Sequence, residues 1–386
     1  MLSVNDNLYD DKFNVNSLCE YFHQRRKVIL GDLISQIVLS HQKTLLLSDV
    51  GERFSRDRNQ ASFCCPHCQN MHFNRKGVRR RVFKSVLGRI HIPVVQVMCR
   101  HCRLRFCPYK ELTGLTFTDR ISSTLMDRQV SLTCKIPYHQ ARLFVESCLG
   151  VAVSPMRIRK QVDREAEAIR SQHLTAEDQV VYTDSTKVKA GEKERGESIH
   201  IAITAVPVAR GNRFVARKRL LFLKTGRAPK IKHSLKGLAA RGIVHDGDMD
   251  LTGCAPFVQR CLWHLPHQMK HFLWLDGMSH EDKQPWIKRL VNIVFGTRDT
   301  ATLKVYYSRF MEDLRCMNCT NAYTHLKNAE NELTVSREQC FCYHTTAPIE
   351  REMREINRRA DVGVRWSVKG VENLLLVKMF KRLNKP

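Results

Sequence analysis

The sequence has few acidic residues for its length and no long apolar segment. Its 386 residues include 38 Asp and Glu against 64 Lys and Arg, a formal net charge of +26. Such a surplus repels itself unless a polyanion neutralises it, so nucleic acid is the first candidate partner. No apolar run approaches the ~18 residues of a membrane-spanning helix, and the first residues lack the basic tip and apolar stretch of a signal peptide. We therefore expect a cytoplasmic, nucleoid-associated protein without a membrane partner.

Internal repeats and low-complexity tracts are also lacking. Apolar residues make up 43% of the chain and charged residues 26%, which is ordinary for globular proteins and excludes wholesale disorder. The length exceeds what one hydrophobic core normally serves, so several folding units are expected. Fifteen cysteines in a reducing compartment are more typical of metal ligands or buried thiols than of disulfides.

The N-terminal part of the chain divides into a helical region and a small basic module. Residues 1–60 are expected to be helical because apolar side chains recur at steps of three and four between residues 17 and 48. Within residues 61–112, β-branched runs on either side of Gly88 predict two strands around a turn. Residues 51–120 hold 15 Lys and Arg against 4 Asp and Glu, so the charge is concentrated here.

Residues 113–175 again have helical periodicity and fit a helix-turn-helix. Two short helices are separated at Gly150, and the second opens with Ser154 as a cap. That helix carries Arg157, Arg159 and Lys160. A helical linker with a solvated basic face is the alternative to a DNA-reading element.

From residue 176 to residue 386 we expect one mixed α/β core, which makes the whole chain a multidomain α+β protein. Three strands, a helix and two further strands are predicted between residues 178 and 263, with the helix at SLKGLAAR, residues 234–241. An all-helical insertion follows at about residues 266–345. One or two closing helices, interrupted near Gly363, end the chain.

The most specific spacing is that of two CxxC pairs, CPHC and CRHC. Four thiolates on two tight turns can close a tetrahedron around Zn²⁺, and a β-hairpin between them makes a zinc ribbon. A closed set of four ligands leaves no position for water or substrate, so this zinc would be structural. The predicted ligands are Cys65, Cys68, Cys99 and Cys102.

A second group of cysteines could also bind zinc, but its spacing is less regular. One arm is CxC rather than CxxC, and the first pair lies in helical sequence, so packed free thiols are the favoured interpretation. The group comprises Cys316, Cys319, Cys340 and Cys342, with His344 nearby.

Three acidic residues of the α/β region are candidates for catalysis. Asp184 follows the apolar strand VVYT, Asp246 follows GIVH, and Glu350 begins a helix after Pro348. Carboxylates gathered at one edge of a sheet suit Mg²⁺, and two such ions can activate the attacking oxygen and stabilise the leaving oxygen of a phosphodiester. Taken singly, each of these acids is better explained as a cap or turn residue.

In this order, the motifs resemble DDE transposases of bacterial insertion sequences, in particular the Mutator-like group with an N-terminal zinc ribbon. The DST around Asp184 and the HDG around Asp246 look like the first two catalytic acids. TTAPIERE, NRR and RWSVKG look like the helix of the third acid, Glu350, and its tail. The segment CLWH resembles the family signature in which a cysteine and a histidine are separated by two residues.

The resemblance implies an RNase H-like core, two Mg²⁺ or Mn²⁺ ions held by Asp184, Asp246 and Glu350, and one structural Zn²⁺. Asp248 or Asp250 could replace Asp246, and Glu352 or Glu355 could replace Glu350. Cys261 and His264 would support the site or contact the substrate strand, and Asn357 shares the helix face of Glu350. The residues expected to contact DNA are Arg79, Arg80, Arg81, Arg157, Arg159, Lys160, Arg358, Arg359, Arg365 and Trp366.

The implied function is a transposase that binds terminal inverted repeats and catalyses DNA cleavage and strand transfer as a dimer or larger assembly. Positioning and metal ions would carry most of that chemistry. Two alternatives remain at this point. One is a zinc-ribbon regulator with an inactive core, and the other is a nuclease or resolvase that cuts without joining.

Overall fold

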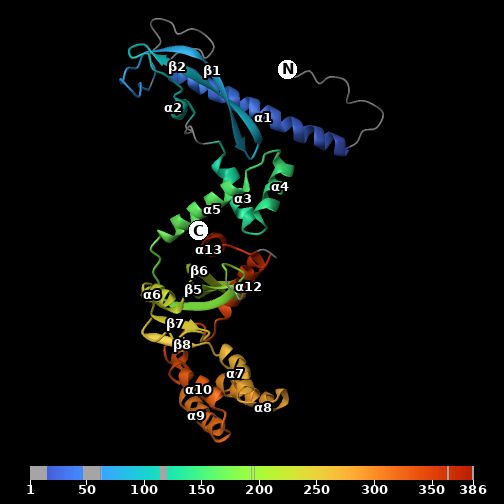
Figure 1. The fold of residues 1–386 in the computed structure, drawn as a ribbon, viewed down its shortest axis with the longest axis vertical. Helices are drawn as coiled ribbons and strands as arrows, with labels where there is room; N and C mark the ends of the chain where they lie inside the picture. Colours follow the sequence, from blue (N-terminus) through green and yellow to red (C-terminus); the bar gives the residue numbers. More distant parts are fainter. Residues whose placement is uncertain are drawn as a thin grey trace. The chain divides into compact units, whose positions relative to one another are not determined.

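The computed structural model describes residues 15–46, 61, 63–113, 120–192, 194, 196–362 and 365–384. The chain forms two compact units, residues 1–159 and 160–386, divided within helix α5 (Pro155–Arg170). Helices and two sheets are both present, which confirms the mixed α+β class (Figure 1). The division into two units is coarser than the four predicted regions, whose boundaries stay a prediction. No helix among the described residues is long and apolar enough to cross a bilayer.

Unit 1 is built on a long β-hairpin covered by a helix. Strands β1 (Phe73–Ser85) and β2 (Gly88–Cys99) are antiparallel, and the short β3 (Arg105–Phe106) pairs with β2. The predicted turn is present, and Gly88 takes a φ of 104° that favours glycine. Helix α1 (Val15–Leu46) packs on β2, where the buried Gln42 donates to the Pro93 carbonyl and accepts from the Val95 amide.

Three further helices follow the short α2 (Tyr109–Thr113) in unit 1. Helix α3 (Ser123–Thr133) is capped by Ser122, and α4 (Tyr138–Leu149) ends at Gly150 in the left-handed conformation. Four residues then lead into α5, where the Ser154 hydroxyl accepts from the Arg157 amide. The separation of the two helices at Gly150 is as the sequence predicts.

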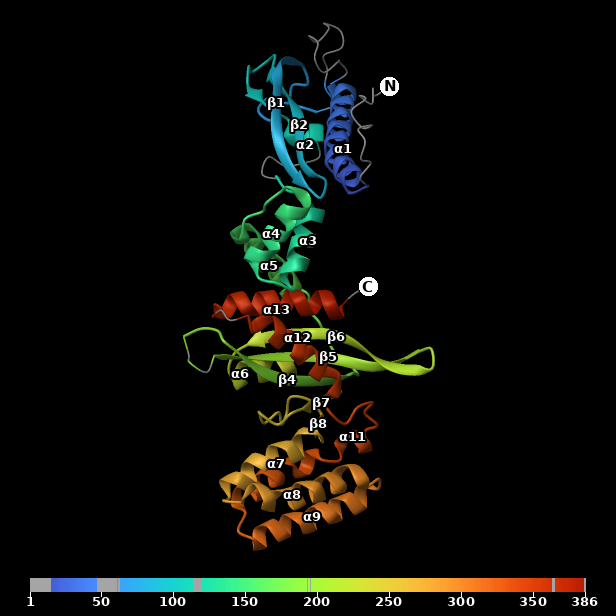
Figure 2. The same ribbon diagram turned by 90° about the vertical axis from the view of Figure 1, so that its right-hand side faces the viewer.

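Unit 2 contains a five-stranded sheet of order β6-β5-β4-β7-β8 (Figure 2). Pairing is antiparallel from β6 through β5 to β4 and parallel from β4 through β7 to β8. The strands that lie between the others are apolar because both of their faces are covered. The bounds are β4 (Val180–Val188), β5 (Glu197–Arg210), β6 (Arg213–Thr225), β7 (Gly242–His245) and β8 (Phe257–Arg260).

Helices pack against this sheet from distant parts of the chain. Helix α12 (Ala347–Ala360) contacts β4 and α13 (Val368–Leu383) contacts β6. Glu352, only 2% exposed, binds Lys218 of β6 at 2.8 Å and Arg382 of α13 at 2.7 Å. These two ion pairs connect α12 to the sheet and to α13. Removing one partner would be costly, because it would leave an uncompensated charge.

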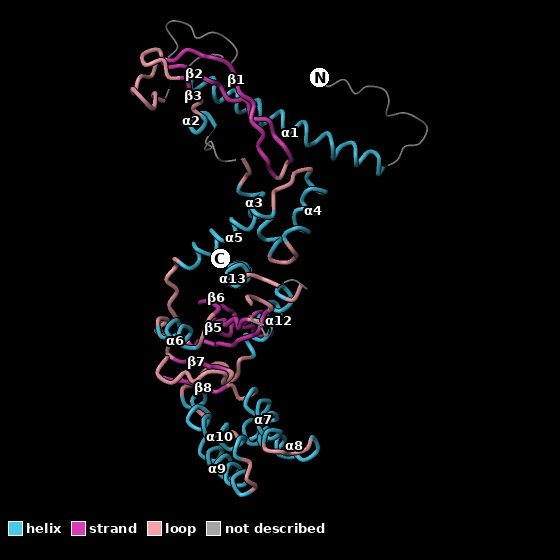
Figure 3. Tube along the Cα trace, viewed as in Figure 1, coloured by secondary structure: helices cyan, strands magenta, loops and turns pink. Residues whose placement is uncertain are grey.

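The residues between β8 and α12 form the predicted all-helical block (Figure 3). Its own apolar core includes Leu265, Leu290, Phe310 and Leu326. The elements are α7 (His264–Leu275), α8 (His280–Val291), η1 (Asn292–Gly296), α9 (Thr300–Cys316), α10 (Thr320–Ala329), η2 (Glu330–Glu332) and α11 (Val335–Glu338).

Two predicted details differ from the structure. The helix expected over residues 234–241 is α6 (Ala228–Lys236), because Pro229 suits the first turn and Gly237 ends the helix. Asp184 does not end its strand, because β4 continues to Val188 through pairing with β5. The closing helices are separated between Ala360 and Val368, as predicted, although Gly363 itself lies outside the described residues.

Candidate functional site

The two CxxC pairs meet at one end of the β1–β2 hairpin. The four sulfur atoms of Cys65, Cys68, Cys99 and Cys102 all lie within 4.8 Å of one another. The sulfurs of Cys65 and Cys102 are 3.6 Å apart, and those of Cys68 and Cys99 are 3.5 Å apart. The predicted cluster is therefore confirmed, and its all-thiol donor set on two tight turns fits a structural Zn²⁺.

Backbone amides around the cluster favour thiolates, which are the form that binds metal. Burial raises the pKa of Cys99, but backbone N–H groups of Cys102 and His101 lower it to about 7. The Leu104 amide lowers the pKa of Cys102, yet burial and the neighbouring sulfurs raise it overall. A cation that neutralised the whole group would remove this mutual repulsion.

Asp184 and Asp246 lie side by side on neighbouring parallel strands. Thr183 of β4 pairs with His245 of β7, so the two aspartates follow at the same level. Their carboxyl groups are within hydrogen-bonding reach of each other. The carboxyl end of the parallel β4–β7 pair thus gathers two acids, as the sequence predicts.

The pKa values of Asp184 and Asp248 are both raised at this site. Burial and then the neighbouring Asp246 raise the pKa of Asp184 to about 7, although the Ser185 amide donates to Asp184 at 2.7 Å. Asp248 lies on the same side, since its carboxylate accepts from the Ser185 hydroxyl at 3.2 Å and its amide donates to Asp246 at 3.1 Å. Burial and Asp246 raise the pKa of Asp248 as well. Three acids in one place are the arrangement that a divalent cation relieves.

Asp250 is bound elsewhere. Its carboxylate accepts from the Thr252 amide at 2.9 Å and pairs with Lys232 at 2.9 Å, and these contacts hold its pKa well below the usual range. Of the acids that could take the place of Asp246, Asp250 is therefore accounted for as a turn residue, while Asp248 adjoins the pair.

His264 provides a positive charge beside the acids. Burial alone would lower its pKa, but hydrogen bonding to Cys261 and the charges of Asp184 and Asp246 raise it to about 9. Thr346 completes the group, because its hydroxyl lies 3.2 Å from the His264 Nδ1 and 3.4 Å from the Cys261 sulfur. The Thr346 amide also donates to that sulfur at 3.3 Å. Cys261 is fully buried, and its sulfur contacts both His264 and Thr346.

Thr346 is the N-cap residue of α12, the helix that carries Glu350 in its first turn. The helix is also held lower down, where Asn357 accepts from the Thr186 hydroxyl of β4 at 3.0 Å. Burial lowers the pKa of His267, which lies one turn after His264. The negative charge of Glu350 offsets part of this lowering. The predicted third acid thus lies on a helix anchored at two points to the strands and helix that carry the other residues.

Glu350 does not complete a compact ligand set with the aspartates. Within the described ranges, the four ribbon cysteines are the one group of three or more potential ligands whose atoms all lie within 4.8 Å. Mg²⁺ keeps several waters and needs only one or two carboxylates, so Asp184 and Asp246 alone fit its chemistry. The donor pair is consistent with a divalent ion, whereas the three-acid arrangement stays a prediction.

A buried ion pair fixes the strand end that precedes Asp246. Glu332 of η2 binds His245 at 3.1 Å and Arg260 of β8 at 2.9 Å, and His245 is only 1% exposed. Gly247 has a φ of 101°, and a Cβ atom there would lie 1.8 Å from an Arg260 nitrogen. Glu332 of the helical block therefore supports the loop that contains Asp246, through its contacts with His245 and with Arg260 of β8.

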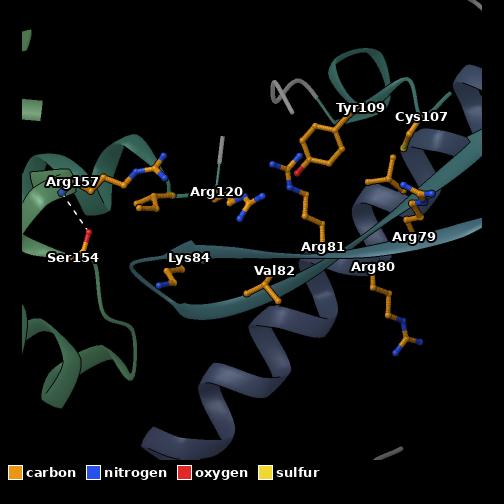
Figure 4. Close-up of a pocket in the computed structure, with 12 residues that line it drawn as sticks. Arg79, Arg80, Arg81, Val82, Lys84, Cys107, Tyr109, Arg120, Ser154 and Arg157 are labelled. Atoms are coloured by element: carbon orange, nitrogen blue, oxygen red, sulfur yellow. Dashed lines mark hydrogen bonds between the residues drawn. The ribbon is translucent and has the colours of Figure 1, made fainter. Parts of the chain in front are cut away.

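A basic cavity of about 610 Å³ lies within unit 1 (Figure 4). No acidic residue lines it, and the Arg81 guanidinium stacks over the Tyr109 ring at 4.4 Å. A cavity this cationic suits phosphate groups. Four of the predicted DNA contacts line this cavity: Arg79, Arg80, Arg81 and Arg157. Lys84 and Arg120, which were not predicted, line it as well.

The remaining predicted DNA contacts are not gathered in this cavity. Arg159 and Lys160 are exposed on α5, and Arg358 is exposed on α12. Arg359 is 1% exposed and stacks at 4.9 Å over the ring of Trp366, which argues for a role in the fold rather than in DNA binding. Arg365 is exposed next to Trp366 and donates to the Gly191 carbonyl.

The second cysteine group is dispersed in the described part of the chain. Cys316, Cys340 and Cys342 are exposed, whereas Cys319 is buried. They do not form a cluster with ligand atoms within 4.8 Å of one another. Of the four, only Cys319 is packed in the interior as the favoured interpretation expects, and the other three thiols are exposed.

Sequence reasoning did not single out Thr346, Ser185 or Glu332. Thr346 had a local signal, because a threonine just before Ala-Pro is typical of a helix N-cap. Ser185 adjoins Asp184 but became relevant only through its contact with Asp248. Glu332 had no local signal, since its partners lie more than 70 residues away.

No protein-family model matches this chain, and the search of curated proteins finds no match.

Proposed function

We propose that this protein is a DNA transposase that cuts strands and joins them to a target by metal-dependent phosphoryl transfer. The observation that carries the proposal is that Asp184 and Asp246 lie together just beyond the last paired residues of the adjacent parallel strands β4 and β7. The order and direction of the five strands, and the packing of α12 on β4, support an RNase H-like core. Glu350 is the proposed third acid.

Asp184 and Asp246 would hold Mg²⁺ or Mn²⁺, which would activate the attacking oxygen and stabilise the leaving oxygen of a phosphodiester. His264, with its pKa raised to about 9, stays protonated at neutral pH and offers a positive charge to a phosphate oxygen. Cys261 and Thr346 hold this imidazole in place. Such fixed charges stabilise a transition state in which negative charge accumulates on phosphate oxygens.

Unit 1 would hold the DNA ends. The hairpin and cysteine cluster, the helices α4 and α5, and the basic cavity support this assignment. The separation of α4 and α5 by four residues after Gly150 supports the helix-turn-helix part of it. Because two ends must be brought together, we expect a dimer or a larger assembly.

A cleavage assay tests the proposal. A plasmid carrying the DNA that flanks the coding sequence should be nicked by the wild-type protein in Mg²⁺ and not in EDTA. Asp184→Asn should abolish nicking and keep DNA binding, whereas Glu281→Gln, at an acid exposed on α8, should leave both nicking and DNA binding unchanged.

The products distinguish the alternatives. Joined strands support a transposase, and cleavage without joining indicates a nuclease or resolvase on the same core. DNA binding without any cleavage indicates a regulator with an inactive core. Cleavage retained by Asp184→Asn would refute the assigned site.

A further inference from the structure

The β5–β6 hairpin extends beyond the rest of its sheet as a two-stranded ribbon (Figure 2). Pairing between β4 and β5 extends only to Val181 opposite Thr204, whereas β5 and β6 stay paired to Arg210 opposite Arg213. Every residue of β5 from Val206 onward is exposed, and so are the first three residues of β6. We call residues 206–217 the hairpin end.

The hairpin end has two different faces. Residues directly opposite each other in an antiparallel pair point to the same side. One face therefore carries arginines and valines, and the other carries small apolar residues with one aromatic ring. The first consists of Val206 with Arg217, Val208 with Val215 and Arg210 with Arg213, and the second of Pro207 with Ala216 and Ala209 with Phe214.

Phe214 is 80% exposed, the highest value among the large exposed hydrophobic residues described. It lies next to Arg213, and the turn between the strands contains Gly211 with a φ of 58°. With Pro207, Ala209 and Ala216 on the same face, the ring forms an exposed apolar patch, and such patches mark interaction sites. The opposite face of the same tip presents the guanidinium groups of Arg210 and Arg213, so the partner must accept both an apolar wedge and positive charge.

The positive charge around the hairpin end indicates the chemistry of its partner. Residues 198–245 contain 11 Lys and Arg and not one Asp or Glu. The same stretch of a second copy carries the same positive charge, so contact between two such stretches would be unfavourable, whereas a polyanion would be attracted. A two-stranded ribbon has the width that enters a groove of duplex DNA, and an apolar wedge flanked by arginines is typical of proteins that kink DNA.

We propose that the hairpin end is a DNA-bending element. Arg210 and Arg213 would contact backbone phosphates, and Phe214 would insert between base pairs. Ile201, opposite Asp184, is nine residues from Arg210, which corresponds to about 30 Å along the strand. The hairpin end would therefore hold duplex DNA outside the reacting nucleotides. This inference rests on the proposed function only for the identity of the ligand, and it requires no catalysis.

Two substitutions in the full-length protein test the two parts of the proposal. The probe is a 40-bp duplex of the DNA that flanks the coding sequence, with a donor and an acceptor dye at its ends. Arg210→Gln with Arg213→Gln should make the plot of log affinity against log salt less steep by about 2, because two phosphate contacts are lost. Phe214→Ala should abolish the energy-transfer change that reports bending, and Phe214→Leu should keep part of it.

Matched controls come from the helical block of the same unit. Arg298→Gln with Arg309→Gln removes two exposed charges, and Trp274→Ala removes a 59% exposed aromatic ring. Neither control should alter the salt slope or the bend. An unchanged slope together with an unchanged bend in the hairpin variants would overturn the proposal.

Sedimentation distinguishes DNA from a second copy of the chain as the occupant. If Phe214→Ala turns a dimer into a monomer while the slope and the bend keep their wild-type values, the hairpin end is a protein interface and the proposal is wrong. Failure of the catalytic assignment is seen separately, as cleavage that survives Asp184→Asn.

Discussion

Asp184 and Asp246 occupy equivalent positions on adjacent parallel strands, each one residue beyond the paired Thr183 and His245. The register of β4 against β7 thus places two carboxyl groups together although they are 62 residues apart in the chain. Without a cation, their burial and their proximity are both unfavourable to two negative charges, and together they raise the pKa of Asp184. The arrangement stores repulsion that a divalent ion or a proton can release.

The first prediction concerns Asp184→Asn in the absence of divalent metal. The pKa of Asp184 is raised from 3.8 to about 7, so between these values the unfolded chain loses its proton while the folded protein keeps it. Stability therefore falls as the pH rises through this window. At pH 8 the variant should be more stable than the wild type by roughly 2 kcal/mol, allowing for partial exposure of the carboxyl. At pH 4 the difference should disappear.

Urea denaturation in EDTA, followed by tryptophan fluorescence, measures this difference. All four tryptophans lie in unit 2, at positions 263, 274, 286 and 366, so the signal reports on the unit that contains Asp184. Glu281→Gln serves as the control and should follow the wild type at every pH. Equal stability of Asp184→Asn and wild type at pH 8 would contradict the coupling of the two acids.

The second prediction concerns the cysteine cluster. Cys65→Ser should reduce bound zinc from about one ion per chain to none and unfold the β1–β2 hairpin next to the cysteines, because binding energy in a closed zinc site is also folding energy. Cys64→Ser is a close control, since Cys64 is exposed and bonded to Gln69 outside the cluster. Elemental analysis after dialysis measures the zinc, and unaltered zinc in Cys65→Ser would disprove the ligand assignment.

The third prediction concerns the loop that follows β7. Gly247→Ala combines a positive φ with a Cβ that meets Arg260, whereas Gly253→Ala has a φ of 73° and open space around the new atom. Gly253→Ala should cost about 1 kcal/mol of stability through backbone strain alone. Gly247→Ala should cost at least about 3 kcal/mol, because Arg260 must also move away from Glu332. Urea denaturation measures the loss of stability in both variants. Equal losses would mean that Arg260 can move aside without cost.

The fourth prediction concerns the basic cavity of unit 1. Arg79→Gln with Arg157→Gln should weaken binding of duplex DNA and make the salt dependence less steep by about 2, as expected for two phosphate contacts. Arg89→Gln, an exposed position of the same hairpin outside the cavity lining, should have a smaller effect. Fluorescence anisotropy from 50 to 200 mM salt measures both. Identical slopes for the two variants would remove the cavity from the DNA interface.

Local patterns in the sequence predicted the elements and the cysteine cluster well. Two CxxC pairs around a β-branched hairpin identified Cys65, Cys68, Cys99 and Cys102, because the spacing itself dictates the geometry. Apolar runs predicted three strands, a helix and two further strands between residues 178 and 263, and β4, β5, β6, α6, β7 and β8 lie there in that order. The helix α6 begins six residues before the predicted helix, because Pro229 suits the first turn and Gly237 ends the helix.

Contacts between distant residues were beyond the reach of these patterns. The pairing of β4 with β7 decides that Asp184 meets Asp246, and no local signal contains that register. Likewise, the burial of Arg359 depends on Trp366 and on the closing of α12 against the sheet. The distance of Glu350 from the aspartates depends on how Thr346 anchors α12 to Cys261 and His264.

Binding of a divalent ion by Asp184 and Asp246 is the central claim, and Mn²⁺ soaked into crystals of the full-length protein tests it most directly. Anomalous scattering locates Mn²⁺ without reference to any assumed chemistry. We predict a peak in contact with both carboxylates in the wild type and its loss in Asp184→Asn crystals. Mn²⁺ bound only elsewhere, or bound at this position despite the substitution, would contradict the account.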